Sequence, residues 1–397
     1  MKILHSIASV DPAGGGPIEG VKQLSSMAKL GGHEVEIVSL DAPDAPFLKS
    51  FPHVVHPLGP GQFTYGFSKR FVPWLRANAS KFDVIVVNGI WQYQSFGVWR
   101  ALRSSSTPYV VFTHGMLDPW FKRTYPLKHL KKWLYWPWGD YRVLRDAAAV
   151  LFTCEEERLL ARQSFWLYKV QDLTVNYGTS APDKSGNATQ AQFLRRFPGT
   201  GGKRLVLFMG RIHPKKGCDL VIKAFARVLG SERDWHLVLA GPDQVGWRSE
   251  LDTLANRLGI SEQITWTGLV SGDLKWGLFE AAEVLLLPSH QENFGIVVAE
   301  ALACGLPALI SNKVNIWREI ETDGGGLVAG DDLDGAASLL RTWLAMPDDA
   351  KAKMRESARD CFRSRFEIRR ASSSLLNILA AVVEQNNSLN STAIQLT

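Results

Sequence analysis

The chain has 397 residues, of which 46% are hydrophobic, and it carries a formal net charge of +6 at pH 7. This length is too great for one ordinary core and suits two domains. No apolar run approaches the ~18–20 residues that a membrane-spanning helix needs. The four scattered cysteines lack the spacing of a zinc site or a disulfide framework.

The first residues, MKILHSIASVD, predict a strand and not a signal peptide, because they carry one lysine and a short apolar run before a glycine-rich loop. Together with cysteines suited to a reducing compartment, they favour a bacterial cytoplasmic protein. The positive net charge indicates an anionic partner. Composition leaves open whether that partner is nucleic acid, a phosphorylated ligand or a membrane face.

Short, continuous apolar runs alternate with helical patterns along the chain, which is typical of parallel sheets covered on both faces. We therefore expect an α/β fold with two doubly wound Rossmann-like domains that face each other across a cleft. The predicted strands are residues 2–7, 35–40, 83–89, 109–115, 149–153 and 173–178 in the first half, and 204–210, 235–241, 264–268, 284–289 and 307–311 in the second.

The domain boundaries follow from composition. We expect the first domain at residues 1–180 and the second at 203–367, with a joint at 179–202 that is rich in Ser, Thr, Gly and Pro. A helix over 368–385 is expected to pack back on the first domain. The polar residues 386–397 read as a disordered tail.

In open parallel sheets, ligands bind beyond the carboxyl ends of the strands. After the first predicted strand, Gly14, Gly15 and Gly16 precede Pro17, a good first-turn residue for a helix. Backbone without side chains there can approach a phosphate. A dinucleotide site, with Asp41 as the ribose-binding acid, and a plain flexible loop remain as alternatives, although the spacing is not G-x-G-x-x-G.

Cations and a histidine follow three further strands. Arg211 and Lys216 stand between a strand and a helix, where a guanidinium fork and an ammonium suit a diphosphate. Solvated loop charges are the alternative. His114 follows the strand at 109–115, where it serves either a ligand or the structure.

Two acids, Glu292 and Glu300, lie on either side of the turn that follows the predicted strand at 284–289. Gly295 permits a tight turn into a helix whose free N–H groups attract an anion. Glu292 before it and Glu300 within the helix would repel a phosphate, so they fit sugar or ribose hydroxyls better. Acids that favour the start of a helix are the alternative. Taken together, the cations and acids describe a nucleotide-sugar site.

These motifs identify a resemblance that covers nearly the whole chain. The E-x7-E stretch ENFGIVVAE, with GRIHPKKG upstream and ACGLPALIS downstream, resembles the retaining GT-B glycosyltransferases of family 4. The glycine-rich first loop and the THG triplet agree with it. Asn88 stands where a His is common in the family, and Cys154 where a Ser is common.

The resemblance implies roles for individual residues. Arg211 and Lys216 would hold the donor diphosphate, Glu292 the donor sugar and Glu300 the ribose. His114 would contact the sugar or the acceptor near the reacting carbon, and the departing phosphate would act as the base. Further residues would line the donor, chiefly through their backbone: Gly15, Gly16, Gly268, Leu269, Val270, Asn293, Phe294, Gly295, Ile296 and Val297.

No cofactor and no essential metal are expected. The D-x-D at Asp332–Asp334 reads better as a helix start than as a metal site. The basic, aromatic segment 117–145 contains Lys128, Lys131 and Lys132 with Trp133, Trp136 and Trp138. It suggests an anionic membrane surface, hence a peripheral place on the inner face of the plasma membrane. Tryptophans that pack on their own domain are the alternative, and no RNA-binding module is visible.

The leading hypothesis is transfer of a hexosyl group from a GDP- or UDP-sugar, with retention of configuration. The acceptor would be a glycan or a lipid-linked sugar in bacterial lipopolysaccharide or exopolysaccharide synthesis. The alternatives are a nucleotide-sugar epimerase of GT-B fold, an NAD-type dehydrogenase and a non-catalytic sugar-nucleotide binder.

Overall fold

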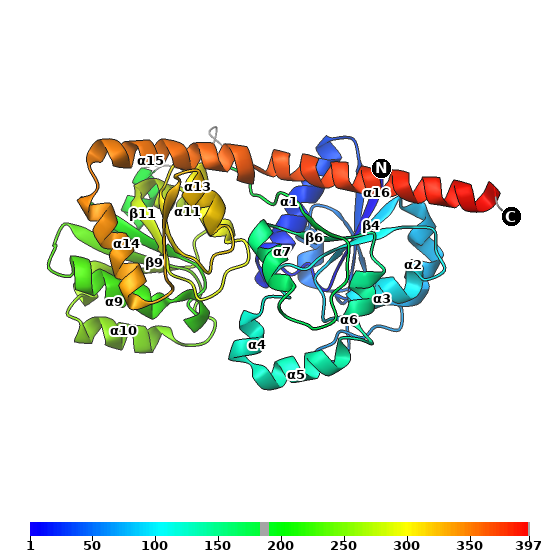
Figure 1. Cartoon of the computed structure of the whole chain (residues 1–397). Helices are drawn as coiled ribbons and strands as arrows, with labels where there is room; N and C mark the ends of the chain where they lie inside the picture. The colour runs from blue at the N-terminus through cyan, green and yellow to red at the C-terminus, as the bar shows by residue number, and fades with distance from the viewer. Residues whose placement is uncertain (183–189, 396–397) are drawn as a thin grey trace. The chain divides into compact units, whose positions relative to one another are not determined.

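The computed structural model describes residues 1–182 and 190–395, which fold into two units (Figure 1). Unit 1 comprises Met1–Gly178 and Ile368–Thr397, and unit 2 comprises Thr179–Glu367. Each unit contains its own parallel sheet. The boundary of unit 1 lies two residues before the expected end of the first domain.

Unit 1 contains a seven-stranded sheet in the order β3-β2-β1-β4-β5-β6-β7, in which all neighbouring strands are parallel. Leu4 of β1 pairs with Glu36 of β2 and Ile85 of β4. All five residues of β4 are buried, since helices cover both faces. The strands are β1 (Lys2–Ile7), β2 (Glu34–Ser39), β3 (Val54–Pro57), β4 (Val84–Asn88), β5 (Tyr109–Phe112), β6 (Ala149–Phe152) and β7 (Asp172–Thr174).

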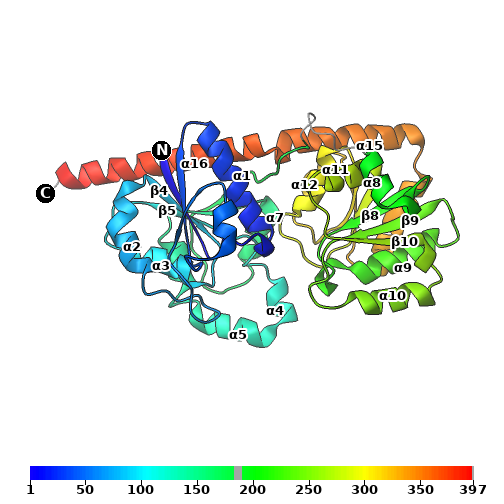
Figure 2. The same cartoon turned by 180° about the vertical axis from the view of Figure 1, so that it is seen from behind.

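The helices of unit 1 flank this sheet. α1 packs against α16, and α3 packs against both α2 and α6. Figures 1 and 2 show α1 with α16 on one side of the sheet and α3 with α6 on the other. The helices are α1 (Gly16–Leu30), α2 (Phe71–Asn78), α3 (Tyr93–Leu102), α4 (Trp120–Thr124), α5 (Pro126–Tyr135), α6 (Asp140–Arg145), α7 (Glu155–Ala161) and α16 (Ile368–Gln395).

Unit 2 contains a six-stranded parallel sheet in the order β10-β9-β8-β11-β12-β13. Leu207 of β8 pairs with Val238 of β9 and Leu285 of β11, and all three side chains are buried. The strands are β8 (Arg204–Met209), β9 (Trp235–Ala240), β10 (Ile264–Gly268), β11 (Ala282–Leu287), β12 (Ala308–Ser311) and β13 (Gly326–Ala329).

Helices also cover both faces of the second sheet. α9 packs against α10 and α14, whereas α11 packs against α8, and α15 against α12 and α13. Figures 1 and 2 show α9 and α10 on the face opposite α11 and α15. The helices are α8 (Gln190–Arg196), α9 (Cys218–Leu229), α10 (Arg248–Arg257), α11 (Gly272–Ala281), α12 (Ile296–Ala303), α13 (Trp317–Thr322), α14 (Leu333–Ala345) and α15 (Asp348–Cys361).

The predicted fold class, with two doubly wound parallel sheets, is confirmed, and every predicted strand exists within a few residues of its expected bounds. The sequence reasoning missed β3 and β13. Both are four-residue strands at the edge of a sheet and are mostly half-buried. A half-buried edge strand does not require a continuous apolar run, so its sequence signal is weaker.

Two expectations about the connections differ from the structure. The joint expected at 179–202 contains α8, which packs on α11 because Phe193 is fully buried; residues 183–189 lie outside the described residues. The tail expected to be disordered from residue 386 is helical as far as Gln395. There Asn386 Nδ2 donates a hydrogen bond to the Ser106 carbonyl at 2.7 Å, which ties the helix to unit 1.

The strand orders place the candidate site. In each sheet the order reverses beside the first strand, between β1 and β4 and between β8 and β11. Loops that leave the carboxyl ends of such neighbouring strands diverge, which opens space for a ligand. In the part of the chain that the structure describes, no helix has both the length and the apolar character that crossing a bilayer requires.

Candidate functional site

In unit 2, the loop that follows β8 lies against the loop that follows β11. Gly217 adopts a left-handed conformation with φ 68°, and a Cβ there would lie 2.5 Å from the Pro288 carbonyl oxygen. The His290 N–H donates to the Lys215 carbonyl oxygen at 2.9 Å. This close approach, which needs a glycine, carries Lys216 to the second loop.

Lys216 and Glu292 form an ion pair across these two loops. Lys216 is buried, and Glu292 is held by its backbone, which donates to the Lys313 carbonyl at 2.9 Å and accepts from the Asn315 N–H at 3.0 Å. Burial and two neighbouring cations, one of them Arg211, lower the pKa of Lys216 from its ordinary value. The Glu292 carboxylate opposes this effect because it favours the charged ammonium.

Arg211 is exposed in the loop that follows β8, at the carboxyl ends of the strands. Its Nη1 donates to Gln244 Oε1 at 3.1 Å. Since that partner is a neutral amide, the hydrogen bond orients the guanidinium without cancelling its charge. Arg211 can therefore present a cation to a ligand beyond the strand ends.

α12 begins at Ile296, after a short turn that follows Glu292. Gly295 precedes the helix with φ 70°, and a Cβ there would lie 3.2 Å from both Glu292 Cγ and Val314 Cγ1. The N–H groups of Ile296 and Val297 have no partner within the helix, so they favour a negative ligand. Phe294 anchors the turn by packing edge-on against Phe366 with ring centroids 5.6 Å apart.

Glu300 is buried within α12 and accepts a hydrogen bond from Lys275 Nζ of α11 at 2.8 Å. The Lys275 ammonium also lies 4.5 Å from the centroid of the Trp276 ring. Sequence reasoning missed Lys275 because a single lysine within a helix carries no motif. The pair fixes the orientation of the Glu300 carboxylate.

The segment Gly268–Val270 also lies at the carboxyl ends of the strands, after β10. Gly268 ends β10 with φ 66°, and its carbonyl accepts from the Gly241 N–H at 2.9 Å. Leu269 is 76% exposed, whereas Val270 is buried. The Asp332 side chain, in contrast, accepts from the Gly335 N–H at 2.7 Å and caps α14, so the predicted helix start at the D-x-D is confirmed.

In unit 1, the glycine-rich loop leads from β1 into α1. Gly15 precedes the helix with φ 81°, and a Cβ at Gly15 or Gly16 would meet no atom within 4 Å. Asp41 accepts from Ser9 Oγ at 2.5 Å and from the Val10 N–H at 2.9 Å. Asp41 therefore holds this loop, which gives the acid after β2 a structural role.

His114 stands after β5 in a left-handed conformation with φ 49°. Its Nε2 lies 3.2 Å from Asn88 Oδ1, while Asn88 Nδ2 donates to the Val86 carbonyl at 3.2 Å and lies 3.2 Å from His5 Nδ1. Because the amide nitrogen is the donor, the amide oxygen accepts from His114 Nε2–H and leaves His114 Nδ1 unprotonated. Burial lowers the pKa of His114 to about 4, so the ring is neutral at pH 7.

A buried carboxylate holds the strained backbone beside His114. Glu157 Oε1 accepts from Thr113 Oγ1 at 2.8 Å and from the Gly115 N–H at 2.6 Å. Glu157 Oε2 accepts from both the N–H and the hydroxyl of Thr153, at 2.8 and 2.7 Å. Sequence reasoning missed Glu157, although its position in the first turn of a helix after a buried strand is a usable signal.

The basic, aromatic segment 117–145 divides into inward and outward side chains. Trp136, expected at a lipid surface, is fully buried: it stacks on Phe165 with centroids 4.2 Å apart and donates to the Leu167 carbonyl at 2.7 Å. Lys132 lies over the Trp91 ring at 4.3 Å. For these two side chains the lipid-facing expectation is wrong, because they pack on their own unit.

Comparison with known proteins identifies the family. Residues 191–360 match the family model described as Glycosyl transferases group 1, and residues 15–175 match the Glycosyl transferase 4-like domain. The two models together match most of the chain. The chain belongs to this family of glycosyltransferases.

The curated relatives are matched over part of their length. A D-inositol 3-phosphate glycosyltransferase of Mycolicibacterium paratuberculosis is 38% identical over 228 residues, which cover 55% of this chain and 50% of the relative. The alpha-D-kanosaminyltransferase of Streptomyces kanamyceticus is 29% identical over 189 residues, with coverages of 47% and 48%. The chain thus spans about half the length of these relatives.

Solved structures resemble this glycosyltransferase-family chain over nearly its whole length. Anabaena HepE in complex with UDP and glucose has a TM-score of 0.76 at 18% identity, covering 96% of this chain and 100% of that chain. WaaG, a glycosyltransferase involved in lipopolysaccharide biosynthesis, has a TM-score of 0.66 at 18% identity, with coverages of 95% and 99%. The expected GT-B architecture is confirmed by these neighbours.

Each glutamate of the E-x7-E motif therefore forms an ion pair. Glu292 contacts Lys216, and Glu300 contacts Lys275, so each acid of the motif has a lysine partner from another element. Within unit 2, the structure brings the expected residues to one edge of the sheet. Within unit 1, Gly15, Gly16 and His114 likewise follow the carboxyl ends of strands.

The Glu157 contacts predict a specific loss of stability. In Glu157→Gln the amide nitrogen cannot accept, so two of the four donors lose their partner, which costs about 1–3 kcal/mol per buried unpaired group. Chemical denaturation should show a lower free energy of unfolding for this variant. Glu384→Gln, the same change at an exposed site on α16, is the control. Equal stabilities of the two variants would contradict the role of Glu157.

The buried histidines predict acid sensitivity. Burial lowers the pKa of His114 to about 4 and of His5 to about 3, below the ordinary value of 6.5. As the pH falls from about 6.5 to about 4, the unfolded chain binds protons that the folded chain does not, so stability decreases. His114→Asn should reduce this slope by up to about 1.4 kcal/mol per pH unit. Parallel stability curves for the variant and the wild type would oppose this expectation.

Proposed function

We propose that the chain transfers a hexosyl group from a nucleotide sugar to a glycan or lipid-linked acceptor, with retention of anomeric configuration. The observation that carries the proposal is the buried Lys216–Glu292 ion pair beside the first turn of α12, with Arg211 on the adjoining loop. Cations and free helix N–H groups suit a diphosphate, and carboxylates suit hydroxyl groups.

The diphosphate of the donor would be held by Arg211, Lys216 and the first turn of α12. An ammonium has three donors, and Glu292 occupies part of that capacity, so Lys216 is oriented and can still donate to a phosphate oxygen. Negative charge grows on the diphosphate as the bond to the sugar breaks. Fixed cations at that position stabilise the transition state more than the bound substrate.

The two acids would bind the sugar parts of the donor. Glu292 is placed beside the diphosphate cations and would accept from hydroxyls of the transferred hexose. Glu300, oriented by Lys275 at 2.8 Å, would accept from the ribose hydroxyls. Neither acid is required as the general base, because the departing phosphate would take the proton of the acceptor hydroxyl as that oxygen bonds to the anomeric carbon and the bond from the sugar to the diphosphate breaks.

His114 would contribute a neutral imidazole from unit 1. Its Nε2–H donates to Asn88, so Nδ1 is free to accept from a sugar hydroxyl. The low pKa keeps this acceptor unprotonated across the neutral range. Asn88, which replaces the His common in the family, thereby sets the tautomer of His114.

The substrate class is proposed from the relatives. The HepE structures contain UDP, UDP-glucose or UDP with glucose, which makes UDP-sugars the first donors to test and GDP-sugars the second. WaaG acts in lipopolysaccharide biosynthesis, which supports a bacterial surface glycan as the product. The curated relatives, named for inositol phosphate and kanosamine chemistry, make small acceptors the alternative.

Thermal unfolding with a panel of nucleotide sugars tests the proposal, since a ligand bound to the folded state raises its stability by mass action. The stabilising donor is then incubated with and without acceptor. A glycosylated acceptor with the anomeric configuration of the donor supports the proposal. An isomerised donor formed without acceptor would instead establish the epimerase alternative.

Loss of one diphosphate cation should reduce turnover. Arg211→Ala or Lys216→Ala is expected to lower kcat on the order of 10²-fold or more, as for other single charge contacts to a transition state. Arg257→Ala is the matched control, because Arg257 is exposed in the last turn of α10, at the opposite edge of the sheet. Near-normal turnover in both site variants would argue against these roles.

Metal dependence separates this mechanism from one that uses a bound divalent ion. If Arg211, Lys216 and the α12 N–H groups neutralise the diphosphate, activity should persist in excess chelator. The measurement is the transfer rate with and without chelator. Loss of activity that magnesium restores would defeat this part of the proposal.

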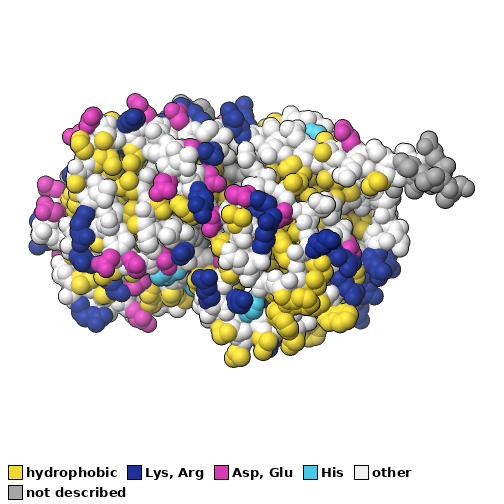
Figure 3. Space-filling view, in the orientation of Figure 1, with side chains coloured by type: hydrophobic (Ala, Val, Ile, Leu, Met, Phe, Trp, Pro, Cys, Tyr) yellow, Lys and Arg dark blue, Asp and Glu magenta, His cyan; other side chains and the backbone are white. Residues whose placement is uncertain are grey.

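We also propose that α5 contacts an anionic membrane. One face of α5 exposes Leu127, Leu130, Trp133 and Leu134, while the opposite side packs on unit 1 through side chains such as Lys132. Figure 3 shows hydrophobic side chains gathered in this region. Exposed apolar residues of this kind mark an interaction surface, and the neighbouring Lys128 and Lys131 suit acidic lipid headgroups.

Charge reversal on α5 tests this contact. Lys128→Glu/Lys131→Glu should lower co-sedimentation with vesicles containing phosphatidylglycerol by roughly tenfold or more, since a basic residue near such a surface contributes about 1 kcal/mol. Lys69→Glu/Lys353→Glu, the same change at exposed lysines elsewhere, should keep most of the binding. Unchanged co-sedimentation of the α5 variant would refute the proposal.

A further inference from the structure

A hollow of about 880 Å³ lies in unit 1, away from the residues discussed so far. It is bordered by the end of α2, the turn Ala79–Lys81, the end of α3 and the loop that follows α3. The turn precedes β4 and the loop precedes β5, so the hollow lies at the amino ends of the strands. His114 and the glycine-rich loop follow the carboxyl ends, at the opposite edge of the same sheet.

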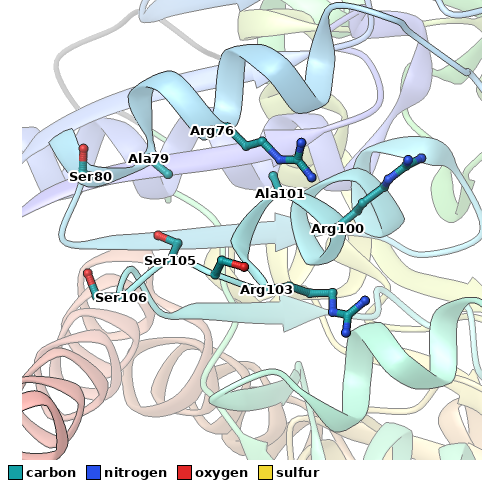
Figure 4. A pocket seen from close by; sticks show the side chains of 9 residues that line it. Arg76, Ala79, Ser80, Arg100, Ala101, Arg103, Ser105 and Ser106 are labelled. Carbon is teal, nitrogen blue, oxygen red and sulfur yellow. The ribbon is translucent and has the colours of Figure 1, made fainter. Parts of the chain in front are cut away.

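Three arginines and four serines line this hollow. Figure 4 shows Arg76 extending from α2, Arg100 from α3 and Arg103 from the following loop, with the serine side chains on the other side. The serines are Ser80, Ser104, Ser105 and Ser106. Among the lining residues, all within the described chain, there is no Asp or Glu.

The charges of these arginines are not neutralised within the hollow. The nearby Asp146 is already bound to Arg145 at 2.6 Å and to Trp99 Nε1 at 2.8 Å, although Arg103 contributes to lowering its pKa. Arginine at the end of one helix compensates the helix dipole. That effect accounts for Arg76 and Arg100 singly, but not for the loop residue Arg103 in the lining of the same hollow.

The loop that supplies Ser104, Ser105 and Ser106 is anchored by three hydrogen bonds. The Thr107 N–H lies 3.2 Å from Ser105 Oγ, and Thr107 Oγ1 donates to the Ala79 carbonyl at 3.1 Å. Asn386 of α16 donates to the Ser106 carbonyl at 2.7 Å. The serine hydroxyls are therefore presented by a braced backbone, which lowers the ordering cost of binding.

We propose that this arginine hollow is a binding site for phosphate groups. Guanidinium forks match phosphate oxygens, and serine hydroxyls can donate to the oxygens that the arginines leave free. An anion there would also offset the positive charge that the three arginines bring to the hollow. The proposal does not depend on the transferase activity.

Two sources can supply such a phosphate: an anionic lipid headgroup and a dissolved phosphorylated molecule. A series of cation–π contacts connects the hollow with the basic, aromatic segment 117–145. Arg103 lies over Trp99 at 5.3 Å, and Arg142 lies over Trp99 at 5.8 Å and over Trp138 at 5.4 Å. Trp138 is 69% exposed. This continuity is the reason for a vesicle arm in the test.

The test compares wild type with the triple variant Arg76→Gln/Arg100→Gln/Arg103→Gln. Amide hydrogen exchange of each protein is measured under three conditions. These are the protein without ligand, the protein with inorganic phosphate at matched ionic strength, and the protein with vesicles of phosphatidylcholine and phosphatidylglycerol. The control, Arg195→Gln/Arg233→Gln/Arg257→Gln, removes the same charge at exposed sites in unit 2. All three side chains are exposed, so thermal unfolding should show that both variants fold.

Protection of residues 76–81 and 100–106 that is lost in the first variant and kept in the control supports the site. Protection by phosphate identifies a dissolved ligand, and protection by vesicles alone identifies a lipid headgroup. In the latter case we expect about tenfold weaker vesicle binding by the first variant. The proposal is overturned if neither probe protects these residues, or if the first variant is protected like the wild type.

Discussion

Burial of the strands on both faces is the constraint on which this structure depends. A parallel strand covered by helices on each side has little room for a side chain that needs water, so the polar chemistry gathers where strands end. β4 illustrates this: its first four residues are apolar and its fifth, Asn88, is the residue that binds His114. The same rule places Arg211 after β8 and Glu292 after β11.

Close backbone approach turns these strand ends into sites. Glycine at residue 217 allows two loops to touch, and the Lys216–Glu292 ion pair then forms between them. In unit 1 the left-handed conformation of His114 has an energetic cost that the four hydrogen bonds to Glu157 offset. Both strand ends therefore contain a buried charged group, Lys216 in unit 2 and Glu157 in unit 1.

Unit 1 carries features that the transferase chemistry does not require. The outward face of α5 is exposed and apolar, and the arginine hollow lies at the amino ends of the strands, whereas the glycine-rich loop and His114 follow their carboxyl ends. Such surfaces can change while the strand ends stay the same, because surface positions are less constrained by packing. The candidate site at the carboxyl ends of the strands and the outer surface of unit 1 are thus under different physical constraints.

The sequence by itself determined the central strands of both sheets and the residues expected at their carboxyl ends, but not the edge strands β3 and β13. Continuous apolar runs predict buried strands. The residues that directly follow such a run, including the motif from Glu292 to Glu300, can be assigned to the carboxyl end of a strand from their order in the chain alone. Only the tertiary structure decided the pairings: Lys275 with Glu300, Glu157 with Thr113, and Trp136 inside while Trp133 remains outside. These depend on which elements pack together, and partners separated by tens of residues leave no periodic signal in one sequence.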